Sequence, residues 1–264
     1  MERLQTKDLS VGYGEKLILQ NLNIHIPDKK ITTIIGSNGC GKSTLLKTMT
    51  RIITQQSGSI ILDGENIAKQ KTKLLAQKIA ILPQTPESVS GLTVGELVSY
   101  GRFPYQKGIG KLKRHDLEVI DWALEVTGTS DFKFRSVDAL SGGQRQRVWI
   151  AMALAQETEI IFLDEPTTYL DMAHQLEVLT LLQKLNKEQH RTIIMVLHDL
   201  NQAARFADYL IALKDGKIIK AGDCEEVIQP EVLKTVFNID AYIGRDPRTK
   251  KPMCVTYDII KGVE

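Results

Sequence analysis

The chain's 264 residues include 34 Lys and Arg against 32 Asp and Glu. Its densest basic clusters, residues 107–114 and 248–251, lie in turn-like sequence without interleaved aromatic residues, which argues against a surface that binds nucleic acid. No apolar run approaches the roughly 20 residues of a membrane-spanning helix, and no apolar leader follows Met1, so we expect a cytosolic protein. Three scattered cysteines argue against a disulfide framework and a zinc site. The length fits a single domain over residues 1–264, or one hydrophobic core that carries a smaller subdomain.

The N-terminal residues predict antiparallel β structure. Apolar and polar residues alternate over residues 22–26 before a turn at Pro27 and Asp28, which is typical of a half-buried strand. Asp63-Gly64, directly after residues 59–62, predicts a second hairpin. We therefore expect a small antiparallel sheet at the start of the chain.

Three short apolar runs predict a parallel sheet. They cover residues 31–35, 160–163 and 192–197, and each adjoins residues with helical periodicity. Continuous apolar runs suit strands whose two faces are both covered by helices. The sequence therefore predicts an α/β core.

A glycine-rich segment lies between the first of these runs and a helical stretch, and it reads Gly36-Ser37-Asn38-Gly39-Cys40-Gly41-Lys42-Ser43. It matches the G-x4-G-K-[ST] pattern, in which backbone N–H groups surround a β-phosphate at a helix N-terminus. In this pattern Lys42 reaches the β and γ oxygens and Ser43 ligates Mg²⁺. A glycine-rich turn without function is the alternative, and the strand before it and the helix after it argue against that. We expect these residues to contact ATP: Gly36, Ser37, Asn38, Gly39, Cys40, Gly41, Lys42, Ser43 and Thr44.

Helices are predicted from about residue 85 to residue 155, where strand signals are missing. Thr93 and Glu96 have the spacing of a capping box, and residues 115–126 form an amphipathic pattern. We expect an inserted helical subdomain over about residues 86–158.

A second candidate phosphate site opens the last helix of this region, at Leu140-Ser141-Gly142-Gly143-Gln144. Two glycines in a first turn each weaken a helix by roughly 1 kcal/mol relative to Ala. Their presence therefore indicates a role that requires backbone without side chains. With Ser141 as N-cap, the N–H groups of Gly142, Gly143 and Gln144 can hold a γ-phosphate. Since the first site already holds its own nucleotide, this one serves a second copy, which predicts a head-to-tail dimer. An ordinary glycine-containing helix start is the alternative.

Two acidic residues end the apolar run at residues 160–163. Asp164 is placed to hold Mg²⁺, and Glu165 to orient or deprotonate the water that attacks the γ-phosphate. A structural role is the alternative for an isolated acidic pair, and the phosphate-binding pattern upstream favours the catalytic interpretation.

The C-terminal third carries weaker signals. Lys214-Asp215-Gly216-Lys217 predicts a hairpin, and we predict no structure for a C-terminal extension over about residues 236–264. A helix that packs on the sheet is predicted by four apolar residues at helical spacing, Met172, Leu176, Leu179 and Leu182.

The chain resembles the nucleotide-binding subunit of ABC transporters, over most of its length from Tyr13 to Gly222. The resemblance rests on three motifs in a fixed order: the glycine-rich loop, Leu-Ser-Gly-Gly-Gln, and Asp164-Glu165 at the end of an apolar run. The resemblance implies a RecA-like P-loop core with an antiparallel β subdomain and a helical subdomain. It also implies that Tyr13 stacks on adenine and that His198 hydrogen-bonds the γ-phosphate. Gln84 is implied to sense that phosphate through Mg²⁺ or the attacking water and to link to the permease, and Asp171 to contact the partner subunit. Tyr169 departs from the small residue more usual in the family.

The chain resembles an importer subunit more than other ABC proteins, because it has no second cassette, no long coiled coil and no fused membrane helices. We therefore expect two copies bound peripherally to a separate permease at the cytoplasmic face of the membrane, with a substrate-binding protein as an indirect partner. Residues 101–105, 170–175 and 198–203 resemble the ATPases of iron-siderophore, haem and vitamin B12 importers, most of all the siderophore branch. Haem or vitamin B12 import, or a soluble role without a permease, remain the alternatives.

Overall fold

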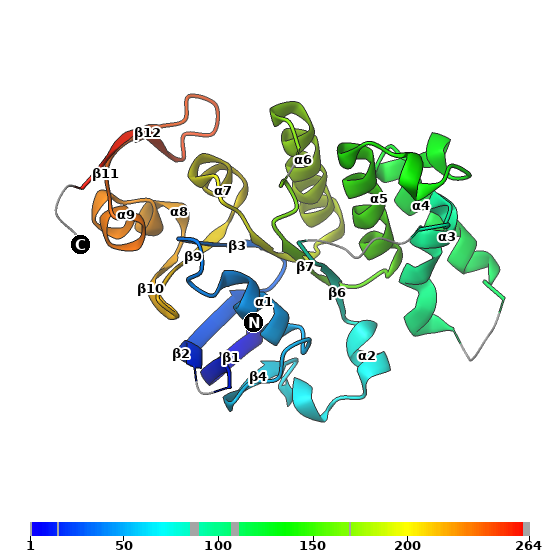
Figure 1. The fold of residues 1–264 in the computed structure, drawn as a ribbon, viewed down its shortest axis with the longest axis horizontal. Coiled ribbons are helices and arrows are strands. Elements are labelled where there is room, and N and C mark those ends of the chain that lie inside the picture. The colour runs from blue at the N-terminus through cyan, green and yellow to red at the C-terminus, as the bar shows by residue number, and fades with distance from the viewer. Residues whose placement is uncertain (1, 15, 85–89, 107–110, 169, 261–264) are drawn as a thin grey trace. The chain divides into compact units, whose positions relative to one another are not determined.

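The structure is a computed structural model that describes residues 2–14, 16–84, 90–106, 111–168 and 170–260. Its chain forms two compact units (Figure 1). The first unit contains Met1–Lys69 and Thr192–Glu264, and the second contains Gln70–Arg191.

The N-terminal part of the first unit is an antiparallel sheet, as predicted. Its strands are β1 (Glu2–Tyr13), β2 (Lys16–Pro27), β4 (Ser57–Leu62) and β5 (Glu65–Asn66), in the order β2-β1-β4-β5. A short 3-10 helix, Ile67–Lys69, follows β5. Buried and exposed residues alternate along the second half of β2, so one face of the sheet packs against the core.

A second sheet in the first unit carries the predicted parallel strands. Strand β3 (Ile31–Gly36) lies between β8 (Thr192–Val196) and β9 (Tyr209–Lys214), parallel to both, and β10 (Lys217–Gly222) pairs antiparallel with β9. Every residue of β3 and of β8 is buried, because both faces of these strands are covered. Helix α1 (Lys42–Met49) follows β3 and helix α7 (Leu200–Phe206) follows β8, so loops that lead into helices begin at the ends of both strands.

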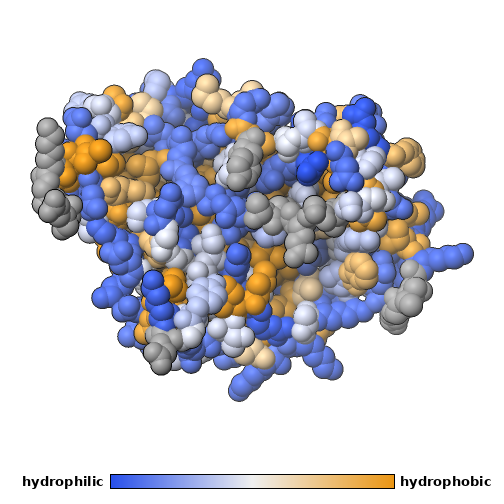
Figure 2. Space-filling view, viewed as in Figure 1, coloured by the Kyte–Doolittle hydropathy of each residue, from blue (hydrophilic) through white to orange (hydrophobic). Residues whose placement is uncertain are grey.

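The sequence predicted no structure for the C-terminal extension, and its described residues, up to Ile260, form the end of a helix and a β-hairpin. Helices α8 (Cys224–Val227) and α9 (Pro230–Phe237) lead into a hairpin of β11 (Ile239–Arg245) and β12 (Pro252–Ile259). Strand β11 packs on α9 and strand β12 packs on α7 (Figure 1). Figure 2 shows apolar side chains in the region where Figure 1 draws this hairpin, and the exposed apolar residues of the hairpin are Tyr242, Val255, Tyr257 and Ile259.

The second unit consists mainly of helices around one pair of strands. Strand β6 (Ile79–Leu82) is parallel to β7 (Ile160–Asp164). The helices are α2 (Thr72–Ala76), α3 (Val94–Ser99), α4 (Arg114–Val126), α5 (Gly142–Ala155) and α6 (Met172–Gln189), with 3-10 segments at Tyr100–Tyr105, Ser130–Phe132 and Val137–Ala139. Thr93 and Glu96 form the predicted capping box at the start of α3. The boundaries of the helical subdomain, residues 86–158, stay a prediction.

The prediction that four apolar residues of α6 share a buried face is wrong for the first two of them. Leu179 and Leu182 are buried, but Met172 is 80% exposed and Leu176 is 39% exposed. The buried residues of α6 begin at Val178, so the first turns of this helix are exposed in the described chain.

A buried arginine organises the second unit. Arg102 is 1% exposed, its Nε donates to Asp116 Oδ1 at 2.9 Å, and its Nη1 donates to the Ala155 carbonyl at 2.8 Å and to Glu157 Oε2 at 3.1 Å. Its guanidinium also lies 4.1 Å from the ring centre of Tyr105. Arg102 therefore ties the 3-10 segment after α3 to α4 and to the end of α5.

Replacing Asp116 with Asn is expected to lower the free energy of unfolding by about 3 kcal/mol, because it removes a charge partner from a buried guanidinium. Burial raises the pKa of Asp116, but the Lys113 N–H and the Arg102 guanidinium outweigh it and hold that pKa below its usual range. A depressed pKa stabilises the fold above the unfolded value, about 4, and this contribution is lost as the pH falls through the folded pKa. Urea unfolding should therefore show a large difference at pH 7 that shrinks below about pH 4.

The control is Asp121→Asn on the same helix, whose partner Lys133 is at the surface. Its expected cost is below about 1 kcal/mol, as for other exposed ion pairs. Equal losses of unfolding free energy in the two variants at pH 7 would contradict the stabilising role of the buried Arg102–Asp116 pair.

Candidate nucleotide-binding site

The glycine-rich loop of the first unit joins a buried strand to a helix, as its pattern predicts. It leaves the end of β3 at Gly36, and α1 begins at Lys42. Lys42 is buried, and its Nζ donates to the carbonyls of Gly36 and Ser37, each at 2.9 Å. The lysine side chain thus folds back across its own loop. Ser43 and Thr44 occupy the first turn of α1.

Two glycines in this loop meet steric limits that a side chain would violate. A Cβ on Gly36 would lie 2.3 Å from the Leu213 carbonyl oxygen, so β9 approaches the loop too closely for any other residue. Gly41, the N-cap of α1, has a φ of 106°, and a Cβ there would lie 2.6 Å from Leu19 Cδ2. These positions therefore require glycine for the chain's own packing as well as for access of a ligand to the backbone.

Cys40 lies in the same loop and is nearly fully buried. Burial raises the pKa of its thiol, although the Lys42 ammonium acts in the opposite direction. The Cys40 carbonyl accepts a hydrogen bond from Gly216 N at 3.1 Å, which links the loop to the β9–β10 turn. Cys40 therefore contributes packing and backbone contacts to the loop, with a thiol that stays protonated.

Two further predicted residues belong to the first unit. Tyr13 is the last residue of β1 and is 59% exposed, so its ring is available for contact. His198 is exposed and lies between β8 and α7. The residue before it, Leu197, donates from its N–H to the Ile34 carbonyl at 3.4 Å, and the residue after it, Asp199, is the N-cap of α7.

The second unit brings Gln84 and Glu165 together at the ends of its two parallel strands. Gln84 Nε2 donates to Glu165 Oε2 at 2.7 Å, although the residues are 81 positions apart. Thr168 Oγ1 donates to the same carboxylate oxygen at 3.0 Å. Glu165 is 8% exposed and has a left-handed backbone with a φ of 53°, so both its backbone and its carboxylate are tightly specified.

Thr168 and Gln146 were not foreseen from the sequence. Gln146 Nε2, on α5, donates to the Pro166 carbonyl at 3.1 Å, which braces the segment after β7. Neither residue has a spacing or motif that would have indicated the contact. Tyr169 lies outside the described residues.

Asp164 ends β7 and is 1% exposed. With the side-chain amide oxygen of Gln84 at the end of the neighbouring strand, it gives the second unit a set of oxygen donors, and the described residues include no cluster of three or more His, Cys, Asp or Glu that could hold a metal. Mg²⁺ prefers oxygen ligands and is usually held by one or two protein carboxylates together with water and phosphate oxygens. The donor set therefore fits Mg²⁺ bound with a nucleotide and does not fit a resident transition metal.

Helix α5 begins as predicted, with Ser141 as its N-cap. Gln144 N donates to Ser141 Oγ at 3.3 Å and Ser141 N donates to Gln144 Oε1 at 3.1 Å, which forms a capping box. A Cβ on Gly142 would meet no described atom within 4 Å, and one on Gly143 would make only ordinary contacts. Packing within the described chain therefore does not account for these two glycines.

Asp171 is the N-cap of α6. Its Oδ1 accepts from His174 N at 3.0 Å and lies 2.9 Å from His174 Nδ1. The His174 N–H holds the pKa of this carboxyl below its usual range. Asp171 is exposed, so it stays ionised and accessible at neutral pH.

Residues 19–168 match the family model described as ABC transporter. The chain therefore belongs to the ABC transporter family: it is an ATP-binding, ATP-hydrolysing subunit with the P-loop α/β core, the antiparallel β region and the helical region of that fold. It is 62% identical to the iron(3+)-hydroxamate import ATP-binding protein FhuC of Bacillus subtilis, over 99% of this chain and 97% of the relative. It is 46% identical to the ferric enterobactin transport ATP-binding protein FepC of Escherichia coli, over 96% and 93%.

Solved structures agree with the fold. An ABC transporter in an inward-facing conformation matches with a TM-score of 0.83 at 30% identity, over 96% of both chains. A dimeric ATP-binding cassette in a post-hydrolysis state with ADP and Pi matches with a TM-score of 0.74 at 30% identity, over 83% of this chain and 98% of that one. In the part of the chain that the structure describes, no helix has the length and apolar character needed to cross a bilayer.

Proposed function

We propose that this ATPase powers the import of a ferric hydroxamate chelate through a separate membrane permease. The observation that carries the proposal is the 62% identity with the iron(3+)-hydroxamate import protein, which spans 99% of the chain and so extends well beyond the family match at residues 19–168. Haem and vitamin B12 are the competing cargoes.

The residues of the first unit would bind the nucleotide. The loop N–H groups and the start of α1 offer donors and a positive dipole end to the β-phosphate, and the Lys42 ammonium adds charge-assisted hydrogen bonds. The exposed ring of Tyr13 would stack on adenine, and His198 would donate to the γ-phosphate. Ser43, Gln84 and Asp164 would hold Mg²⁺, which when bound neutralises charge on the β- and γ-phosphates.

Glu165 would take a proton from the attacking water. Its carboxylate oxygen Oε2 accepts hydrogen bonds from Gln84 Nε2 and Thr168 Oγ1 at the end of β7. A general base must keep one lone pair aimed at the proton it accepts, and these two donors fix the carboxylate in one orientation.

The start of α5 would hold the γ-phosphate of a second copy's ATP, in a two-fold, head-to-tail dimer. Ser141, Gly142, Gly143 and Gln144 would form this contact, and their support is the room around both glycines. The exposed carboxylate of Asp171 would face the partner subunit. Dimeric cassettes among the structural relatives support the same arrangement.

The permease would bind the second unit, which would place the protein at the cytoplasmic face of the membrane. Tyr100 and Phe103 are exposed and form an edge-to-face aromatic pair with ring centres 5.4 Å apart. Exposed aromatic residues of this kind are enriched in protein interfaces. Gln84 would link the permease to the nucleotide through its bond to Glu165.

The test reconstitutes the chain with the permease and the binding protein encoded beside it, in vesicles that hold ATP and Mg²⁺. Labelled iron from ferric hydroxamates should enter in an ATP-dependent way, and the Lys42→Ala variant should abolish entry. A ferric catecholate, haem and cobalamin serve as competing cargoes in the same vesicles. ATP-dependent entry of any of these, without entry of ferric hydroxamates, would reject the hydroxamate assignment.

A further inference from the structure

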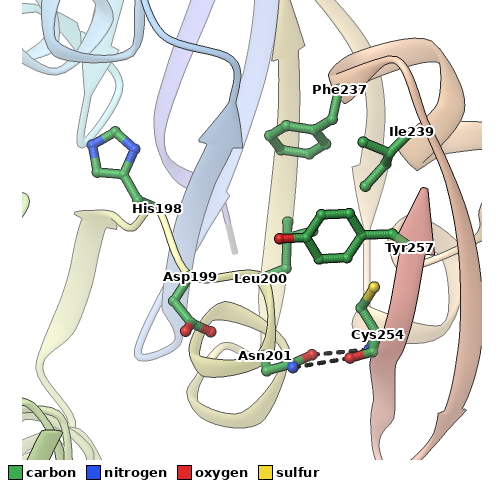
Figure 3. A pocket seen from close by; sticks show the side chains of 8 residues that line it. All are labelled: His198, Asp199, Leu200, Asn201, Phe237, Ile239, Cys254 and Tyr257. Atoms are coloured by element: carbon green, nitrogen blue, oxygen red, sulfur yellow. Dashed lines mark hydrogen bonds between the residues drawn. The ribbon is translucent and has the colours of Figure 1, made fainter. Parts of the chain in front are cut away.

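The C-terminal hairpin is hydrogen-bonded to the first turn of α7. Asn201 Nδ2 donates to the Cys254 carbonyl at 3.1 Å, and Cys254 N donates to Asn201 Oδ1 at 2.9 Å (Figure 3). A carboxamide carries a donor and an acceptor side by side, so it closes this pair of bonds as a neighbouring strand would. Strand β12 pairs with β11 through Ile243 and Cys254, and Asn201 satisfies the backbone of Cys254 on the edge away from β11.

The same C-terminal segment also holds the other end of α7. Lys251 Nζ donates to the Arg205 carbonyl at 3.1 Å and to the Ala207 carbonyl. A lysine ammonium is favoured at a helix C-terminus, where carbonyls lack helical partners and the helix dipole is negative. With seven residues, α7 is too short to be stable by itself, so these contacts at both ends fix its position.

His198 depends on this helix for its own position. Asp199 caps α7 by accepting from Gln202 N at 2.8 Å, and His198 is the residue directly before the cap. On its other side, Leu197 is fixed to β3 through the Ile34 carbonyl. In Figure 3 the His198 ring points away from the hairpin, while Asn201, three residues later, points toward it.

A pocket of about 550 Å³ lies beside the Asn201–Cys254 pair. Residues from α7 and its lead-in line it together with four from the end of α9 and the hairpin: Phe237, Ile239, Cys254 and Tyr257 (Figure 3). Atoms that line a hollow lack van der Waals partners on that side. Side-chain packing around the first turn of α7 is therefore reduced, and the Asn201–Cys254 hydrogen bonds contribute more to holding this turn in place.

We propose that Asn201 is a positioning residue for His198, and that the C-terminal hairpin acts through it to set the His198 ring against the γ-phosphate. The inference rests on the proposed role of His198. Displacement of a catalytic group by about 1 Å can cost about a hundredfold in rate, so a loosened α7 lowers turnover without contact between the hairpin and ATP.

The experiment measures steady-state ATP hydrolysis by the purified full chain, together with its melting temperature. Asn201→Ala should lower kcat about tenfold while the KM for ATP changes less than about twofold, since nucleotide contacts remain. Asn201→Asp, which retains the acceptor for Cys254 N, should recover part of the loss. The matched control is Arg245→Met, which removes an ion pair with Glu225 on α8 and a hydrogen bond to the Lys250 carbonyl but no contact with α7, and its kcat should equal the wild-type value.

A double variant shows whether Asn201 acts through His198. In the His198→Ala background, Asn201→Ala should cause no further loss of kcat in a long-time radiolabelled ATP assay. Losses that multiply, or a kcat for Asn201→Ala equal to that of Arg245→Met, would overturn the proposal. If Asn201→Ala does not fold, Asn201→Asp is measured in its place, because it loses the donor to the Cys254 carbonyl and keeps the acceptor for Cys254 N. Full activity of His198→Ala would instead reject the proposed role of His198, and the positioning role with it.

Discussion

Replacing Glu165 with Gln is expected to leave ATP binding intact and to lower the rate of hydrolysis about a thousandfold. An amide cannot take a proton from water, and general-base catalysis typically contributes about 10² to 10⁴ in rate. The loss should fall on kcat, because the residues proposed to hold the phosphates and Mg²⁺ are unchanged. With hydrolysis blocked, the chain should accumulate as an ATP-bound dimer.

The surroundings of Glu165 make this substitution mild for the fold. A Gln side chain has the same shape, and its amide oxygen can accept the bonds from Gln84 Nε2 and Thr168 Oγ1. The left-handed backbone at this position is no harder for Gln than for Glu, because both have a Cβ of the same kind. Loss of activity should therefore occur without a change in melting temperature.

Phosphate release and gel filtration with ATP and Mg²⁺ measure the two effects. The matched control is Glu159→Gln, an exposed residue just before the start of β7, at the opposite end of the strand from Glu165. It should hydrolyse ATP at the wild-type rate and stay monomeric after turnover. Undiminished phosphate release by Glu165→Gln, with only monomer on the column, would rule out its role as the base.

Local signals in the sequence were enough to predict the buried parallel strands β3, β7 and β8 and the glycine-rich loop. The apolar runs at β3, β7 and β8 have this character because buried parallel strands have no polar face. The G-x4-G-K-[ST] pattern is a single contiguous segment, and Gly36 and Gly41 are also required by their close neighbours. Features of this type need no knowledge of distant residues.

Contacts between distant residues could not be predicted in the same way. Gln84 and Glu165 are 81 positions apart, and their bond depends on the parallel pairing of β6 and β7. Asn201 bonds to the backbone of Cys254, and a backbone group leaves no signature in residue type. The C-terminal hairpin was missed because most residues of its two strands are exposed or half-buried, so no continuous apolar run marks them.

The error at α6 shows the limit of periodicity. Helical spacing indicates which residues share a face, and it does not say how much of that face is covered. The covered part begins near Val178, and Met172 and Leu176 stay exposed. Exposed apolar residues directly after Asp171 are compatible with the proposed contact between this region and a second subunit.

Substitutions at Lys42 and Ser141 are expected to separate the two phosphate contacts. Lys42→Ala removes an ammonium that would bond to the nucleotide held by the same chain, and charge-assisted hydrogen bonds contribute about 1.5 to 3 kcal/mol each. The affinity for ATP should fall about 10- to 100-fold, measured by calorimetry on the isolated monomer. Ser141→Arg should leave this affinity within about twofold of wild type, since Ser141 would contact only the nucleotide of the second copy.

Hydrolysis and dimer formation should nevertheless be lost in Ser141→Arg, because the long side chain fills the space above Gly142 where the second γ-phosphate would bind. The substitution also removes an N-cap, which costs about 1 kcal/mol. Thr93→Arg controls for that cost, since it removes the capping box of α3 in the same unit. Thr93→Arg should dimerise and hydrolyse ATP normally in the isolated protein. If Ser141→Arg abolished ATP binding by a folded monomer, the helix start at α5 would belong to the chain's own nucleotide site, and the shared-site dimer would be wrong.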